Sequence, residues 1–126
     1  MHASTILRLG AAFAGVAVAL GAFAAHAMRD TFPPDSLQTF ETGVRWQMYH
    51  ALALVACTPL SASRRVGIAA MFFVAGIVLF SGSLYGYVFT GVRWFVYLTP
   101  IGGVAFVAGW LALLLAPPVK THAHAA

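Results

Sequence analysis

Four long apolar runs fill almost the whole chain and leave room for little besides short connections. We expect each run to be a helix, at about 6–28, 37–59, 66–87 and 95–116, followed by a tail at 117–126. A helix needs about 20 apolar residues to cross the hydrocarbon core of a bilayer, and every run meets that length. The sequence therefore predicts an all-α membrane protein, in which residues 1–126 form a single bundle of four transmembrane helices.

The composition separates the chain from ordinary soluble proteins. Charged residues make up 8% of the sequence, whereas soluble domains average about 25%. The net charge of +4 is the difference between seven Lys and Arg and three acidic residues, and the basic residues are scattered between the apolar runs. That placement is typical of residues that orient helices in a membrane, so we expect the lipid bilayer as a partner and no nucleic acid.

The first apolar run has two interpretations. Arg8, the apolar stretch after it and A-H-A at 25–27 resemble a secretory signal peptide. The run is also long enough to span a bilayer, and small residues four apart at Ala11, Gly15 and Ala19 leave a face that another helix can approach. We expect a retained first helix, and the mature N-terminus would distinguish the two.

The second run carries the polar residues, within E-T-G-V-R-W-Q-M-Y-H-A-L-A-L at 41–54. At about 100° per residue, Gln47 and His50 lie on one face of the helix, and Glu41 and Arg45 lie on the nearly opposite face. Together with His26 at the outer end of the first run, Glu41 and Arg45 are predicted to form an outer-face polar cluster.

His50 is the sharpest candidate for a functional side chain, because an ionisable group inside an apolar span is costly unless it faces protein or water. One interpretation is a neutral imidazole that bonds across the bundle to Ser83, Tyr85 or Thr99. The other is a ligand-binding or proton-carrying group in a polar pocket of His50, Gln47, Ser83, Tyr85 and Thr99.

A haem held by two histidines is disfavoured, because His26 and His50 would differ in depth by roughly 10 Å or more at the rise of a helix. We expect no cofactor and no metal site. The sequence has no G-x-S-x-G, no H-E-x-x-H and only three acidic residues, so we predict no catalytic residue and no enzyme. Close helix contacts are expected at Gly15, Gly21, Gly82, Gly86, Gly102 and Gly103.

Basic residues predict the orientation. In a four-span chain, one side of the membrane carries four basic residues: Arg8, Arg64, Arg65 and Lys120. The other side carries three: Arg29, Arg45 and Arg93. The side richer in Lys and Arg faces the cytoplasm as a rule, so both termini are predicted to be cytoplasmic.

Four linked motifs resemble a known family. They are G-A-F-A-A-H-A-M (21–28), F-E-T-G-V-R-W-Q-M-Y-H-A-L-A-L (40–54), L-F-S-G-S-L-Y (79–85) and T-P-I-G-G-V-A-F-V-A-G-W (99–110). Together they resemble the small inner-membrane family named domain of unknown function 423 (DUF423), which includes the transmembrane protein 256 group. The family pattern has Gly where Ala24 stands and often Tyr at Trp46. The resemblance implies a multi-pass protein of the bacterial inner membrane with its first helix retained, and it implies no catalytic residue.

Three hypotheses for function follow. The first is an accessory, assembly or structural membrane component that packs against other membrane proteins or itself, motivated by small-residue faces and short loops. The second is a protein that binds a small ligand, quinone, metal or proton around His50. The third is a transporter, supported by Pro100 beside Gly102 and Gly103 as a helix interruption.

Overall fold

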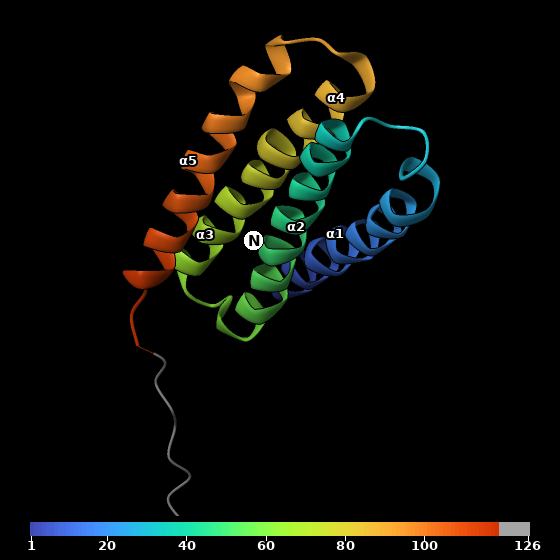
Figure 1. Ribbon diagram of the computed structural model, residues 1–126. Coiled ribbons are helices and arrows are strands. Elements are labelled where there is room, and N and C mark those ends of the chain that lie inside the picture. The colour runs from blue at the N-terminus through green and yellow to red at the C-terminus, as the bar shows by residue number, and fades with distance from the viewer. Residues whose placement is uncertain (119–126) are drawn as a thin grey trace, which may run out of the picture.

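The computed structural model describes residues 1–118, and every regular element in that range is helical (Figure 1). The predicted tail therefore lies mostly outside the described residues. In chain order, the elements are α1 (Ala3–Phe23), η1 (Ala24–Met28), α2 (Pro34–Cys57), η2 (Thr58–Leu60), α3 (Arg64–Gly76), η3 (Ile77–Ser81), α4 (Gly82–Thr90) and α5 (Trp94–Leu114).

The long helices coincide with the predicted apolar runs, but they begin and end at different residues. α2 begins at Pro34, three residues before the expected start at position 37. Proline is favoured at the first position of a helix, because its missing N–H would have no partner there and its φ is already helical. The run predicted at 66–87 is the continuous succession of α3, η3 and α4, and Gly91 ends it in the left-handed conformation, at φ 68°.

The helices pack side by side, with α1 against α2 and α3 against α5 (Figure 1). η3 touches both α2 and α5, so the middle of the third rod joins the two pairs. The larger apolar cluster fills the space between these rods, and its buried residues are Ile6, Ala53, Leu54, Cys57, Val66, Ala69, Ala70, Phe73, Ile77 and Phe106. A smaller cluster of Ala24, Met28 and Phe40 lies near the α1–α2 turn.

Three helical stretches in the described residues are long and apolar enough to cross a membrane: Ala3–Met28, Arg64–Thr90 and Trp94–Leu114. α2 is not among them. With 24 residues it is longer than the span at Trp94–Leu114, which has 21, but Glu41, Arg45, Gln47 and His50 lower its hydropathy. Residues 1–118 thus form an all-helical structure with three candidate membrane spans.

Many large apolar side chains face outward, including Val104 and Leu114 of α5 at 69% and 77% exposure. Contiguous exposed apolar surface is rare on soluble monomers, so this many outward apolar side chains suits an environment of lipid or of other apolar protein.

Candidate functional site

The candidate site is built on the inner face of α2. Gly43, Gln47 and His50 recur at helical spacing and are all buried, whereas Glu41 and Arg45 are exposed. The period of 3.6 residues per turn therefore assigns the two faces of this helix correctly.

His50 lies inside an aromatic cluster, with 2% of its surface exposed. Its ring stacks on Phe106 of α5, with centroids 3.5 Å apart and planes 7° apart. Phe73 of α3 lies at 5.4 Å and Trp46, one turn before His50, at 6.0 Å. The imidazole is thus covered by aromatic rings from three helices.

Both ring nitrogens of His50 have partners. Nδ1 lies 2.8 Å from the backbone carbonyl oxygen of Trp46, and the indole N–H of Trp110 donates to Nε2 at 3.0 Å. The two bonds can form together only if Nδ1 carries the proton and Nε2 is the acceptor, which is a neutral imidazole. The sequence predicted Ser83, Tyr85 or Thr99 as the partner; that prediction is wrong, and the partner is Trp110.

Gln47 bridges three helices. Its amide N–H donates to the carbonyl oxygen of Phe13 in α1 at 2.8 Å, and its amide oxygen accepts from the phenol of Tyr85 in α4 at 2.8 Å. Because Gln47 itself belongs to α2, one buried amide connects α1, α2 and α4.

Two serines of the third rod make further links. The hydroxyl of Ser81 donates to the carbonyl oxygen of Gly43 at 2.7 Å, where α2 and η3 meet. The hydroxyls of Ser83 and Thr99 are bonded at 2.7 Å, which joins α4 to α5. Across residues 1–118, no buried side-chain nitrogen or oxygen lacks a hydrogen-bond partner.

The five residues of the predicted pocket are therefore divided among three separate bonds: Gln47 with Tyr85, Ser83 with Thr99, and His50 with Trp110. The cavities described for residues 1–118 are lined by other residues. The geometry is that of a set of bridges between helices.

The outer-face residues are His26, Glu41 and Arg45, and no hydrogen bond joins them in the described residues. The ring of His26 bonds to the carbonyl oxygen of Ala22 in its own helix at 2.8 Å. Glu41 and Arg45 are exposed on α2. Among the side-chain hydrogen bonds of the described residues, none joins His26 to either of them.

Groups of three or more His, Cys, Asp or Glu placed to hold a metal ion do not occur among residues 1–118. His122 and His124 lie outside the described residues.

Comparison with known proteins assigns the family. The model for "Protein of unknown function (DUF423)" matches residues 20–103, about two thirds of the chain. The chain belongs to the DUF423 family. The matched range contains Gln47, His50, Ser83 and Tyr85, and Trp110 lies beyond it.

Curated relatives of this DUF423 chain are membrane proteins by name. It is 44% identical to UPF0382 membrane protein YwdK of Bacillus subtilis over 112 residues, which cover 86% of this chain and 91% of the relative. It is 37% identical to UPF0382 inner membrane protein YgdD of Escherichia coli over 117 residues, or 89% and 88% of the two chains. No solved structure matches it significantly. Family and apolar helices agree with the integral membrane protein that the sequence predicts.

The six glycines predicted as helix contacts in the DUF423 bundle behave differently. A Cβ added to Gly102 would collide with the backbone of Phe80, and one added to Gly86 would come within 2.8 Å of Phe95. Gly21 makes an ordinary contact with Val44, and Gly103 only approaches Phe80. Around Gly15 and Gly82 such a Cβ would meet nothing within 4 Å, so these two do not pack within one chain.

Sequence reasoning missed a set of closer contacts between α3 and α5. The Phe73 ring lies against Gly109, where an added Cβ would come within 2.6 Å of it. The Phe106 ring lies against Gly76 so closely that any Cβ there would overlap it. In the sequence, these contacts appear only as single glycines and large aromatic residues on different helices. Helix spacing does not tell which glycine faces which aromatic ring.

Proposed function

We propose that this chain is a four-span protein of the bacterial inner membrane, with residues 1–126 forming one transmembrane domain and α2 as the remaining span. α2 has 24 residues and is about 36 Å long, enough for a hydrocarbon core of about 30 Å. Its buried polar side chains are bonded, and the exposed Arg45 side chain is long enough to reach the headgroups.

Both termini are proposed to face the cytoplasm. Arg8, Arg64 and Arg65 belong to the end of the bundle where α1 begins and α2 turns into α3, and Lys120 adds to this side from the sequence. The opposite end carries fewer Lys and Arg and all three acidic residues. This bias favours the first end as cytoplasmic.

In that membrane, the protein acts as an accessory or assembly component that packs against another membrane protein or a second copy. One observation carries this proposal: within residues 1–118 every buried side-chain nitrogen and oxygen has a hydrogen-bond partner in the chain, and several of these bonds join different helices. His50 in particular has both nitrogens bonded and a ring stacked on Phe106, which leaves the interior without a vacant ligand group.

The outward face of α1 supports the same role. α1 packs mainly against α2, and Ala11, Gly15 and Ala19 are exposed on it. Small residues four apart let a second helix approach closely in a membrane, where packing and not the hydrophobic effect drives association. The contacts of Ile6 and Ala17, both buried, favour a retained α1 over a cleaved leader.

A photo-reactive amino acid placed at Gly15 tests this role in native membranes, with Val104 on the exposed face of α5 as the matched control. We expect a discrete protein adduct from position 15 and lipid labelling alone from position 104. The absorbance spectrum and metal content of the purified protein test the alternative. No adduct from position 15 combined with a bound chromophore or stoichiometric metal would overturn the accessory role.

A further inference from the structure

Three adjoining cavities surround the turn between α2 and α3. The first has a volume of about 480 Å³ and a mixed lining, with Ser61, Ser63 and Arg64 on one part and Ile68 and Met71 on another. The second, of about 220 Å³, shares Ala62 and Ser63 with the first. Shared lining residues mean that the two are neighbours.

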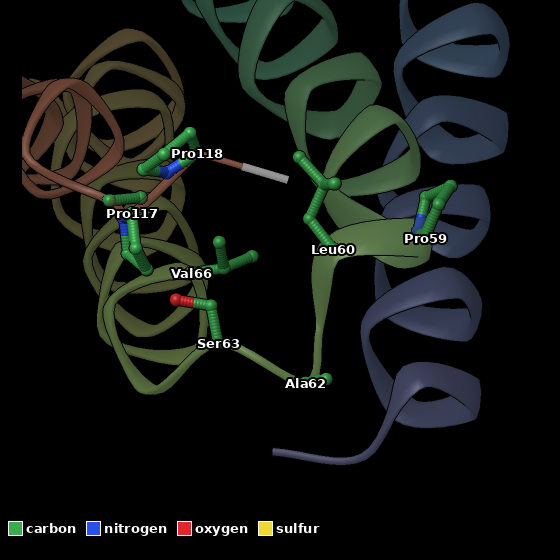
Figure 2. A pocket seen from close by; sticks show the side chains of 8 residues that line it. Pro59, Leu60, Ala62, Ser63, Val66, Pro117 and Pro118 are labelled. Carbon is green, nitrogen blue, oxygen red and sulfur yellow. The ribbon is translucent and has the colours of Figure 1, made fainter. Parts of the chain in front are cut away.

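The second cavity is apolar. Figure 2 shows its labelled residues gathered between the α2–α3 turn, the start of α3 and the chain that follows α5. It is lined by Pro59, Leu60 and Val66, and by Pro117 and Pro118 from the other side.

The third cavity, of about 270 Å³, continues from the second along α5. The two share Leu60, Val66 and Ala116, and the third extends to Leu113 and Trp110. Trp110 lies about one helical turn further into the bundle than Leu113. The three cavities thus form a path that starts at a cationic, hydroxyl-bearing rim and continues along an apolar wall.

The charge at the rim has one sign. Arg64 and the exposed Arg65 open α3, whereas the acidic residues of the chain are Asp30, Asp35 and Glu41, at the opposite end of α2. A basic rim beside an apolar groove complements a molecule with an anionic head and a hydrocarbon tail.

We propose that this path is a binding site for an anionic diacyl phospholipid. The phosphate lies at Arg64 and Arg65 with the hydroxyls of Ser61 and Ser63, and one acyl chain follows the apolar cavities past Leu60 toward Trp110. The inference rests on the four-span arrangement proposed above, because it requires the α2–α3 turn to lie at the membrane interface.

Native mass spectrometry of the full chain in mild detergent tests the site, with dioleoyl phosphatidylglycerol and dioleoyl phosphatidylcholine as probes. We expect the wild type to retain phosphatidylglycerol preferentially. Each basic residue near an anionic surface contributes a factor of about five, so the double variant Arg64→Gln/Arg65→Gln is expected to lose about 25-fold of the preference. The control Arg93→Gln, at the other end of the bundle, is expected to keep it.

Trp110 supplies a second readout, since it lines the third cavity. In a Trp46→Phe/Trp94→Phe background, phosphatidylglycerol with brominated acyl chains is expected to quench its fluorescence more strongly than the brominated phosphatidylcholine. Ala116→Phe, which fills the shared part of the groove, is expected to abolish that difference. Equal retention of the two lipids by the wild type, equal quenching by them in the Trp46→Phe/Trp94→Phe background, or an unchanged preference in the double arginine variant would overturn the proposal.

Failure of the four-span arrangement gives a different result. In a Cys57→Ser background, Thr31→Cys and Ala62→Cys, placed before and after α2, are expected to react with a membrane-impermeant maleimide from opposite sides of sealed vesicles. Reaction of both positions from the same side would show that α2 does not cross, and it overturns both proposals. Reaction from opposite sides in a protein without lipid preference overturns the lipid site alone.

Discussion

The amide of Gln47 provides a quantitative test of how the bundle is held together. Tyr85→Phe removes only the hydroxyl that donates to the Gln47 oxygen, and the ring can stay against Phe40. Hydrogen bonds between membrane helices contribute about 0.6 kcal/mol on average and up to about 1.7 kcal/mol. Tyr85→Phe is therefore expected to lower the free energy of unfolding by about 0.6 to 1.7 kcal/mol. Gln47→Leu also loses the bond to Phe13, so its loss of unfolding free energy is expected to be about twice as large.

Unfolding in mixed micelles with increasing dodecyl sulfate, followed by circular dichroism, measures these differences. In the Gln47→Leu background, Tyr85→Phe is expected to be nearly neutral, because its partner is already gone. Tyr97→Phe is the matched control, since Tyr97 is 76% exposed and its change is expected to have no effect. An equal cost of Tyr85→Phe in both backgrounds would show that the phenol and the amide are not coupled, and the bridge would be refuted.

Other predictions follow from packing. Gly102→Val is expected to prevent correct assembly because its side chain would overlap Phe80, whereas Gly82→Ala meets no atom within 4 Å and is expected to keep the wild-type melting temperature; thermal unfolding of both variants compares them. Cys57 is 4% exposed and is expected to react with a maleimide only after denaturation, as the time course of labelling would show. The intact mass of the protein extracted from membranes is expected to be that of a polypeptide that includes α1. A mass that corresponds to a polypeptide starting after Ala27 would contradict the retention of α1.

The rods and the inner face of α2 could be predicted from the sequence because both depend on local patterns. A run of about 20 apolar residues specifies a helix of membrane length, and a 3.6-residue period places Gln47 and His50 on one face. The start of α2 at Pro34 was also within reach, since proline at the first helical position is a local preference.

The partners of those residues could not be predicted. The bond from Trp110 to His50 joins residues 60 positions apart, and it depends on how far α5 is rotated and shifted against α2. The same holds for glycines. Gly82 and Gly86 share one G-x-x-x-G spacing, yet only Gly86 faces a ring, because the turn after α4 brings Phe95 back over it. Spacing identifies which residues are small, and the facing helix decides which of them matter.

The α3–η3–α4 rod and α5 interlock in both directions. Phe73 and Phe80 fit against Gly109 and Gly102 of α5, and Phe106 of α5 fits against Gly76 in return. Sliding either rod by one turn, about 5.4 Å, would separate the Phe73 ring, the Phe106 ring and the backbone of Phe80 from the glycines they contact. This pair therefore has a single register. A bound neighbour that shifts either of these two rods along its axis would have to break all three contacts or carry the other rod with it.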